Sequence, residues 1–206
     1  MPALSLQESL KLLKKYNIPV AKSEYCRNEK QLAQAVKRLK FPLAMKIVSP
    51  KILHKTDSGG VKLNIKNEKE ALADFSHMKK LPGFQGAIVQ EMASGKQLII
   101  GGKYDEQFGP TILFGLGGIF VEILKDVSVR ICPITRADAK EMYREIKGFA
   151  ILKGARGERA INFRALEDTL LKVNKLLLKE KIKELDINPL FADGKKIVAV
   201  DARVIK

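Results

Sequence analysis

The chain has 206 residues, of which 46% are hydrophobic and 30% are charged, and its net charge is +15. This composition can build a core, and it holds no run of about 18 apolar residues that would predict a membrane span. Two isolated cysteines fit neither a disulfide framework nor a zinc site, so we expect a reducing, cytoplasmic setting. The N-terminal segment predicts a helix rather than a secretory signal.

The positive charge is concentrated in the first third of the chain. Residues 1–66 hold 14 Lys and Arg against 4 Asp and Glu. Such a basic segment favours anionic partners: nucleotide phosphates, coenzyme A, nucleic acid or an acidic subunit. Aromatic residues make up only 6%, and neither a stacking platform nor a zinc-finger or RNP-like pattern is present. We therefore expect neither nucleic acid nor a membrane as a partner.

In chain order, a capping box from Ser5 to Glu8 begins the first predicted helix. Apolar periodicity predicts four further helices, at 28–40, 67–80, 136–147 and 163–179. Strands are predicted at 43–48, 60–65, 86–90, 97–104, 111–115, 127–134, 181–187 and 196–201. The order lacks regular alternation, which indicates an α+β fold of antiparallel sheets covered by helices. The break from Pro82 to Met92 suggests two lobes, residues 1–90 and 91–206.

The first segment that holds candidate binding or catalytic residues runs from the strand at 43–48 into a loop. Lys46 stands within apolar strand sequence, where an unpaired buried cation is costly, so it either snorkels or meets an anion. The loop carries His54 and Lys55 and then two glycines, whose N–H groups can approach an oxyanion. A neutral imidazole there can accept or bind phosphate. The alternative is a structural loop with a surface histidine.

The second segment, at Gln90, Glu91 and Met92, ends a predicted strand shortly before a glycine. A strand end of this kind can offer backbone groups to an adenine edge. An ordinary strand end is the alternative.

The third segment holds Gly117 and Gly118 and, further on, Arg130. It lacks the GK(S/T) ending of a Walker A motif and is no dinucleotide-binding fingerprint. Two interpretations stay open. Either the glycines pack over a ligand while Arg130 binds phosphate, or the glycines make a turn and Arg130 belongs to an ion network.

The fourth segment alternates acids with apolar residues. On a strand, Glu184, Asp186 and Asn188 share one face, and Asp201 follows on the next predicted strand. Carboxylate and amide oxygens are what Mg²⁺ prefers, together with substrate phosphates. The alternative is a polar edge strand that ends in an Asn-Pro turn.

Four long motifs of this chain, SPKILHKTDSGGVKL, FGPTILFGLGGIFVEILKDVSVRICPI, LKGARGERA and ELDINPLF with VAVDAR, carry a family resemblance. In order and spacing they resemble the ATP-grasp subunit of ADP-forming acetyl-CoA synthetases, in the NDP-forming acyl-CoA synthetase superfamily. The resemblance covers nearly the whole chain. It implies an ATP-grasp fold, in which two α+β lobes enclose a nucleotide.

The same resemblance implies roles for individual residues. Lys46 matches a lysine that contacts nucleotide phosphates, and His54 falls in a loop that holds a second phosphohistidine. The hinge that reads adenine and ribose matches Gln90, Glu91 and Met92. The pair that holds Mg²⁺ matches Asn188 and Asp201, with Asp186 close by.

The implied reaction is acyl-CoA + ADP + phosphate giving carboxylate + CoA + ATP, with ATP or ADP and Mg²⁺ as cofactors. The implied partner is a CoA-binding alpha subunit that carries the first phosphohistidine, in an α2β2 assembly. His54 would relay the phosphoryl group to ADP, while Mg²⁺, Lys46 and Arg130 neutralise charge.

This sequence departs from the family at Gln97, where a glutamate is usual, and at Asn64, where a glycine is common. Neither change touches the expected ligands. Two other functions remain open at this point: a stand-alone ATP-grasp carboxylate ligase, which would not need His54, and a nucleotide-sensing subunit without turnover.

Overall fold

The computed structural model describes residues 3–52, 58–118, 121, 123–154 and 158–206. The chain divides into two compact units. The small unit is Ala21–Ala93, and the large unit combines Met1–Val20 with Ser94–Lys206. We expected one boundary after residue 90; the structure instead groups the first 20 residues with the C-terminal part. The α+β class is confirmed, and every described ladder between named strands is antiparallel.

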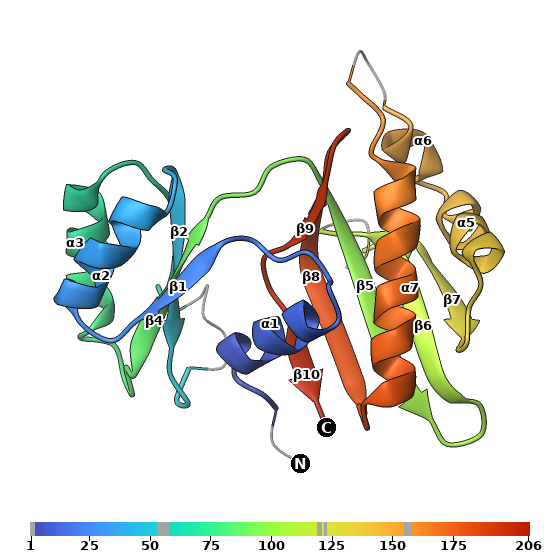
Figure 1. Cartoon of the computed structure of the whole chain (residues 1–206), viewed down its shortest axis with the longest axis horizontal. Helices are drawn as coiled ribbons and strands as arrows, with labels where there is room; N and C mark the ends of the chain where they lie inside the picture. Colours follow the sequence, from blue (N-terminus) through green and yellow to red (C-terminus); the bar gives the residue numbers. More distant parts are fainter. Residues whose placement is uncertain (1–2, 53–57, 119–120, 122, 155–157) are drawn as a thin grey trace. The chain divides into compact units, whose positions relative to one another are not determined.

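The small unit is a four-stranded sheet with two helices on one face (Figure 1). Its elements are β1 (Ser23–Cys26), α2 (Glu29–Arg38), β2 (Leu43–Val48), β3 (Val61–Ile65), α3 (Glu68–Met78) and β4 (Gly86–Glu91). The sheet order is β1-β4-β2-β3. Alternate residues of β2 and β4, including Met45 and Val89, pack with Leu32 of α2 and Phe75 of α3 into one buried core. Lys46 and Gln90 lie on the opposite face of the sheet, away from this core.

The large unit has a sheet ordered β10-β8-β5-β6-β7, with β9 paired to β8. Its helices are α1 (Leu6–Lys15), α5 (Arg136–Glu145), α6 (Phe149–Leu152) and α7 (Phe163–Lys179). Its strands are β5 (Lys96–Asp105), β6 (Gly109–Leu116), β7 (Val127–Ile131), β8 (Glu184–Ala192), β9 (Ile197–Ala199) and β10 (Arg203–Ile205). No described helix is long and apolar enough to cross a membrane.

Helix α7 fixes which face of the large sheet is covered (Figure 1). A Cβ added at Gly102 would lie only 2.6 Å from a methyl group of Leu177 in α7. The absence of a side chain at Gly102 therefore lets α7 pack closely against the sheet. Paired residues of an antiparallel sheet point to the same side. The residues paired across from Gly102, Ile112 and Leu185, therefore face α7, and both are buried. Their neighbours in sequence point to the opposite side, which we call the uncovered face.

Helix α1 joins the large unit through the C-terminal end of the chain. Its capping box is present as predicted, with the Ser5 side chain bonded to the Glu8 backbone. The Leu4 N–H donates to the Val204 carbonyl oxygen over 2.8 Å, which places the chain start beside β10. Glu180, just after α7, accepts hydrogen bonds from Lys15, Tyr16 and Lys206.

The Glu180 cluster predicts an acid-sensitive contribution to stability. Its hydrogen bonds from Lys15 and Lys206 lower the pKa of Glu180 from 4.5 to about 2. Because the folded pKa is depressed, the stabilisation is complete above pH 4.5 and is lost as pH falls towards 2. We expect Glu180→Gln to lower the free energy of unfolding by about 1 kcal/mol at pH 7.

Urea unfolding of wild type and variant at pH 7, 4.5 and 3 would measure this contribution. The difference should shrink between pH 4.5 and 3. Glu106→Gln, at an exposed turn between β5 and β6, is the matched control and should show no such loss. A difference that is constant over this pH range would contradict the assignment to the ionised Glu180.

Candidate functional site

The small unit brings two predicted residues together on the sheet face away from α2 and α3. Lys46 of β2 is paired with Ile88, and Gln90 of β4 is paired with Ala44, so the two polar side chains are diagonal neighbours. They are 6% and 1% exposed respectively. Within the described residues, the buried Nε2 of Gln90 has no hydrogen-bond partner. A buried amide donor in this state is costly unless something accepts from it.

The other two residues expected at the hinge, Glu91 and Met92, make different contacts. The Glu91 carboxylate accepts the backbone N–H of Lys40, and the Met92 N–H donates to the Pro42 carbonyl oxygen. The Met92 side chain is 38% exposed. These contacts anchor the end of β4 within the small unit. His54 and Lys55 lie outside the described residues.

The large unit gathers the predicted metal ligands around β8. Asp186 pairs with Gly101 and Arg203, which places it on the uncovered face. Asp201 lies between β9 and β10, where the chain passes β8, and the Val200 N–H donates to the Pro189 carbonyl oxygen over 3.3 Å. Burial and, next, the charge of Asp201 raise the pKa of Asp186, so Asp201 acts on Asp186 through its field.

Asn188 and Pro189 lie inside β8, which runs to Ala192, and not in a turn after the strand. The predicted strand at 181–187 thus begins and ends too early. The β5–β8 ladder has a β-bulge between Leu98 and Ile100, where Asn188 and Pro189 stand on the opposite strand. Bulges re-aim side chains and are frequent beside active sites.

The electrostatics of this group suit a hard cation. Burial, and next the charges of Asp201 and Glu184, raise the pKa of Asp186. Its buried Oδ1 has no hydrogen-bond partner in the described part of the chain. Asp186, Asn188 and Asp201 supply carboxylate and amide oxygens, so a cation bound there would relieve the repulsion and satisfy Oδ1. The described residues contain no cluster of three His, Cys, Asp or Glu that could hold a metal by itself.

The two predicted glycines form a close contact with β5. The Gly117 N–H donates to the Gln97 carbonyl oxygen over 2.8 Å, and a Cβ at Gly117 would lie 3.3 Å from the Gln97 backbone. Gly118 follows with φ +62°, a left-handed conformation that favours glycine. The turn thus holds its backbone against Gln97.

A cavity of about 1070 Å³ lies beside this turn in the large unit. Gln97, Gly117 and Gly118 line it, and so do three basic residues for which the sequence predicted no role, Lys96, Arg159 and Lys195. Lys96 forms an ion pair with Glu158 there. Arg159 belongs to the motif LKGARGERA, which could have pointed to it, but Lys195 is exposed in the loop after β8 and no sequence pattern pointed to it. Glu158 and Asp193 also line the cavity, so Arg159 and Lys195 are the basic residues there that could meet an anionic ligand.

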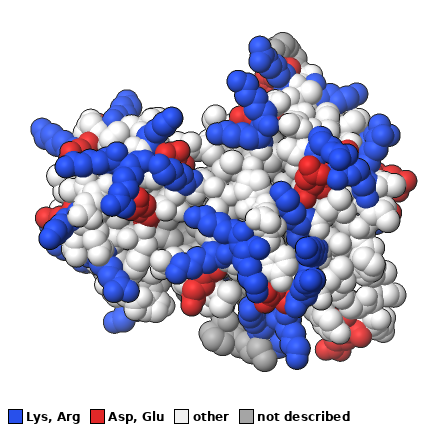
Figure 2. Space-filling model, viewed as in Figure 1, with Lys and Arg blue, Asp and Glu red and all other residues white. Residues whose placement is uncertain are grey.

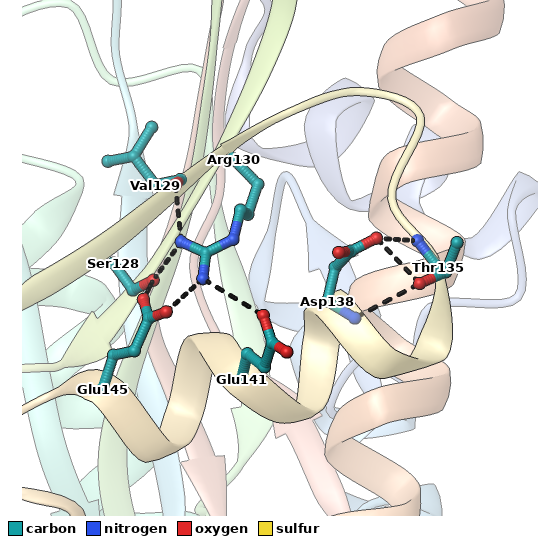
Figure 3. A network of polar contacts seen from close by, with 7 residues as sticks. All are labelled: Ser128, Val129, Arg130, Thr135, Asp138, Glu141 and Glu145. Atoms are coloured by element: carbon teal, nitrogen blue, oxygen red, sulfur yellow. Dashed lines mark hydrogen bonds and ion pairs between the residues drawn. The ribbon is translucent and has the colours of Figure 1, made fainter.

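Arg130 is held away from this group. It pairs with Ile112, which points to the covered face, so its side chain lies opposite to that of Asp186. Its guanidinium forms ion pairs with Glu145 and Glu141 of α5 and donates to Ser128 (Figure 3). The hydrogen bond with Glu145 raises the pKa of Arg130. Of the two interpretations open for Arg130, the structure favours the ion network, which ties α5 to β7. A catalytic role for it stays a prediction.

Basic side chains outnumber acidic ones on the face of the molecule that Figure 2 displays. Figure 2 shows Lys and Arg spread over the displayed face of both units, with fewer Asp and Glu among them. Such a field attracts anions and acidic partners.

Comparisons with known proteins cover nearly the entire chain. A family model described as the ATP-grasp domain matches residues 2–205. The beta subunit of acetate–CoA ligase [ADP-forming] I from Pyrococcus furiosus is 49% identical, over 96% of this chain and 89% of the subunit. Acetate–CoA ligase [ADP-forming] II from Archaeoglobus fulgidus is 43% identical over 96% of this chain, but the chain spans only 29% of that longer protein.

Solved structures agree. Dinucleotide-forming acetyl-coenzyme A synthetase 1 from Ca. Korarchaeum cryptofilum, in complex with coenzyme A and Ca-AMPCP, superimposes with a TM-score of 0.94 at 37% identity. The match covers 98% of this chain and 93% of that one. The same protein, with coenzyme A and Mg-AMPPCP, matches with a TM-score of 0.88 at 35% identity over 98% and 92%. There its phosphohistidine segment points towards the nucleotide-binding site.

Proposed function

Since this chain belongs to the ATP-grasp family, we propose that it is the nucleotide-binding subunit of a cytoplasmic ADP-forming acetate–CoA ligase. The reaction is acyl-CoA + ADP + phosphate giving carboxylate + CoA + ATP. The observation that carries the proposal is Asp186 on the uncovered face, whose buried Oδ1 has no hydrogen-bond partner among the described residues, with Asn188 two residues further along β8 and the charge of Asp201 acting on it. The relatives of matching length and the nucleotide complexes of a related synthetase support it.

In this proposal the acidic group holds Mg²⁺, which when bound neutralises phosphate charge and orients the phosphates. Lys46 provides positive charge to the phosphates, and the Gln90 amide, which has no partner among the described residues, donates to the nucleotide. Glu91 and Met92 form the hinge beside adenine and ribose. Gly117 and Gly118 present backbone at the cavity, and Lys55 adds charge from the loop that holds His54.

The transfer itself is reversible phosphoryl exchange. A β-phosphate oxygen of ADP forms a bond to phosphorus as the nitrogen–phosphorus bond of phosphohistidine breaks, and the electron pair stays on the ring nitrogen. We propose that His54 relays the phosphoryl group between ADP and a first phosphohistidine on a CoA-binding alpha subunit, in an α2β2 assembly. The name "subunit beta" of the Pyrococcus relative supports a separate partner.

Two measurements test this function. Calorimetry of the purified chain should show binding of ADP that strengthens when Mg²⁺ is added, with GDP measured in parallel. Together with its CoA-binding subunit, acetyl-CoA, ADP and phosphate, the chain should form ATP. Absence of nucleotide binding, or ATP formation that does not depend on this chain, would contradict the proposal.

A further inference from the structure

We propose that Gly101, Leu113, Val129 and Ile131 on the uncovered face of the large unit form the docking surface for the partner's phosphohistidine segment. We call these four residues the docking strip. The inference rests on the proposed function. The segment that binds the docking strip belongs to the CoA-binding subunit and presents phosphohistidine with aliphatic side chains beside it.

The strand register places the strip in line with the candidate metal site. Asp186 of β8 pairs with Gly101 of β5, Gly101 with Leu113 of β6, and Leu113 with Val129 of β7. These residues form one row across the uncovered face. Because neighbouring strands lie about 4.8 Å apart, the row from Asp186 to Val129 spans roughly 14 Å. A few residues of an extended segment cover that distance.

Gly101 leaves this row without a side chain at its position, although the fold has room for a Cβ there. A Cβ there would meet Leu113 and the Leu185 carbonyl oxygen at 3.6 Å, an ordinary van der Waals distance. Glycine weakens a strand interior, and in a strand it often marks a place where a ligand or another backbone approaches closely. Gly101 thus keeps the surface beside Asp186 low enough for an incoming group.

The far end of the strip is apolar and exposed. Val129 and Ile131 are 49% and 52% exposed. They stand on β7, which pairs only with β6 in the described part of the chain. A sheet edge with exposed aliphatic side chains and an open row of backbone groups is a liability that stable proteins cover.

The relatives indicate what covers it. In the Archaeoglobus protein this chain corresponds to 29% of one continuous polypeptide, so the remainder is a permanent neighbour. In the related synthetase a phosphohistidine segment points towards the nucleotide-binding site. A segment that lies along this row, with its phosphohistidine at the Asp186 end so that the phosphoryl group can pass to His54, would place its flanking side chains over Leu113, Val129 and Ile131.

The first test combines Val129→Thr with Ile131→Thr, which keep β-branched shapes suited to a strand while they remove apolar surface. We expect an unchanged affinity for ADP with Mg²⁺ and a roughly tenfold higher KM for the phosphorylated CoA-binding subunit in transfer to ADP. Leu178→Gln is the control, since Leu178 is 46% exposed on α7, and it should leave both quantities unchanged.

The second test is Gly101→Ala. Alanine should retain or raise the thermal stability, because it lowers the entropy of the unfolded chain, and should leave ADP binding intact while it slows transfer from the partner. Wild-type transfer in both variants would overturn the docking strip, and loss of ADP binding in Gly101→Ala would overturn the role given to Gly101. Failure of the proposed function is distinguishable, because the wild-type chain would then fail to bind ADP or to accept the phosphoryl group.

Discussion

Replacement of His54 by alanine is expected to abolish phosphorylation of this chain, lowering transfer between ATP and the partner by on the order of 10³-fold or more. A relay needs a nucleophilic nitrogen that is neutral near pH 7, and no substitute of the same chemistry follows in the motif SPKILHKTDSGG. The measurement incubates the chain with Mg²⁺ and γ-³²P-labelled ATP, with and without the CoA-binding subunit. Label on histidine is acid-labile and base-stable.

The chain offers a matched control for this experiment. Its second histidine, His77, is exposed on α3, and His77→Ala should keep the label. If the wild-type chain binds ATP and the partner becomes phosphorylated while this chain never carries label, the relay is wrong. His54 would then shape the loop or bind phosphate, and the partner's histidine would have to visit the nucleotide directly.

Replacement of Asp186 by asparagine is expected to make the protein more stable and less active at once. Burial and the negative charges of Asp201 and Glu184 destabilise the ionised carboxylate of Asp186. Removal of its charge should therefore increase the free energy of unfolding. If the same charge holds Mg²⁺, the variant loses roughly 10- to 100-fold in Mg²⁺-dependent ADP affinity. Thermal unfolding without ligand and calorimetry with ADP at several Mg²⁺ concentrations measure the two effects.

A carboxylate with the opposite environment provides the comparison. Asp105, in the turn between β5 and β6, accepts the backbone N–H groups of Gln107 and Phe108, and these bonds lower its pKa. Asp105→Asn should therefore reduce stability slightly and leave ADP binding unchanged. A stabilised Asp186→Asn variant with wild-type Mg²⁺ dependence would show that Asp186 does not bind the metal.

Local sequence signals predicted much of this fold. The capping box at Ser5 fixed the start of α1, and apolar periodicity located the long helices and most strands, because each depends on residues close together in the chain. The alternation around Asp186 likewise predicted an acidic strand face, since side chains of a strand alternate whatever it pairs with.

Features that depend on pairing between distant segments were not predictable. The sequence could not tell which face of the sheet Arg130 takes, because that follows from the β6–β7 register and the position of α5. The bulge that carries Asn188 likewise depends on the β5–β8 register. Lys195 joins the cavity only because the turn after β8 folds beside the start of β5.

The grouping of the first 20 residues with the C-terminal part has a consequence for synthesis on the ribosome. The small unit is one continuous segment and can fold once residue 93 has emerged. Helix α1 must wait, because the Leu4 N–H bonds to Val204 and Lys15 bonds to Glu180. Because protein synthesis adds about 5–20 residues per second, the apolar side of α1 stays exposed for on the order of 10 s. Residues 1–20 are therefore made well before the residues that cover them and are among the last of these 206 residues to fold.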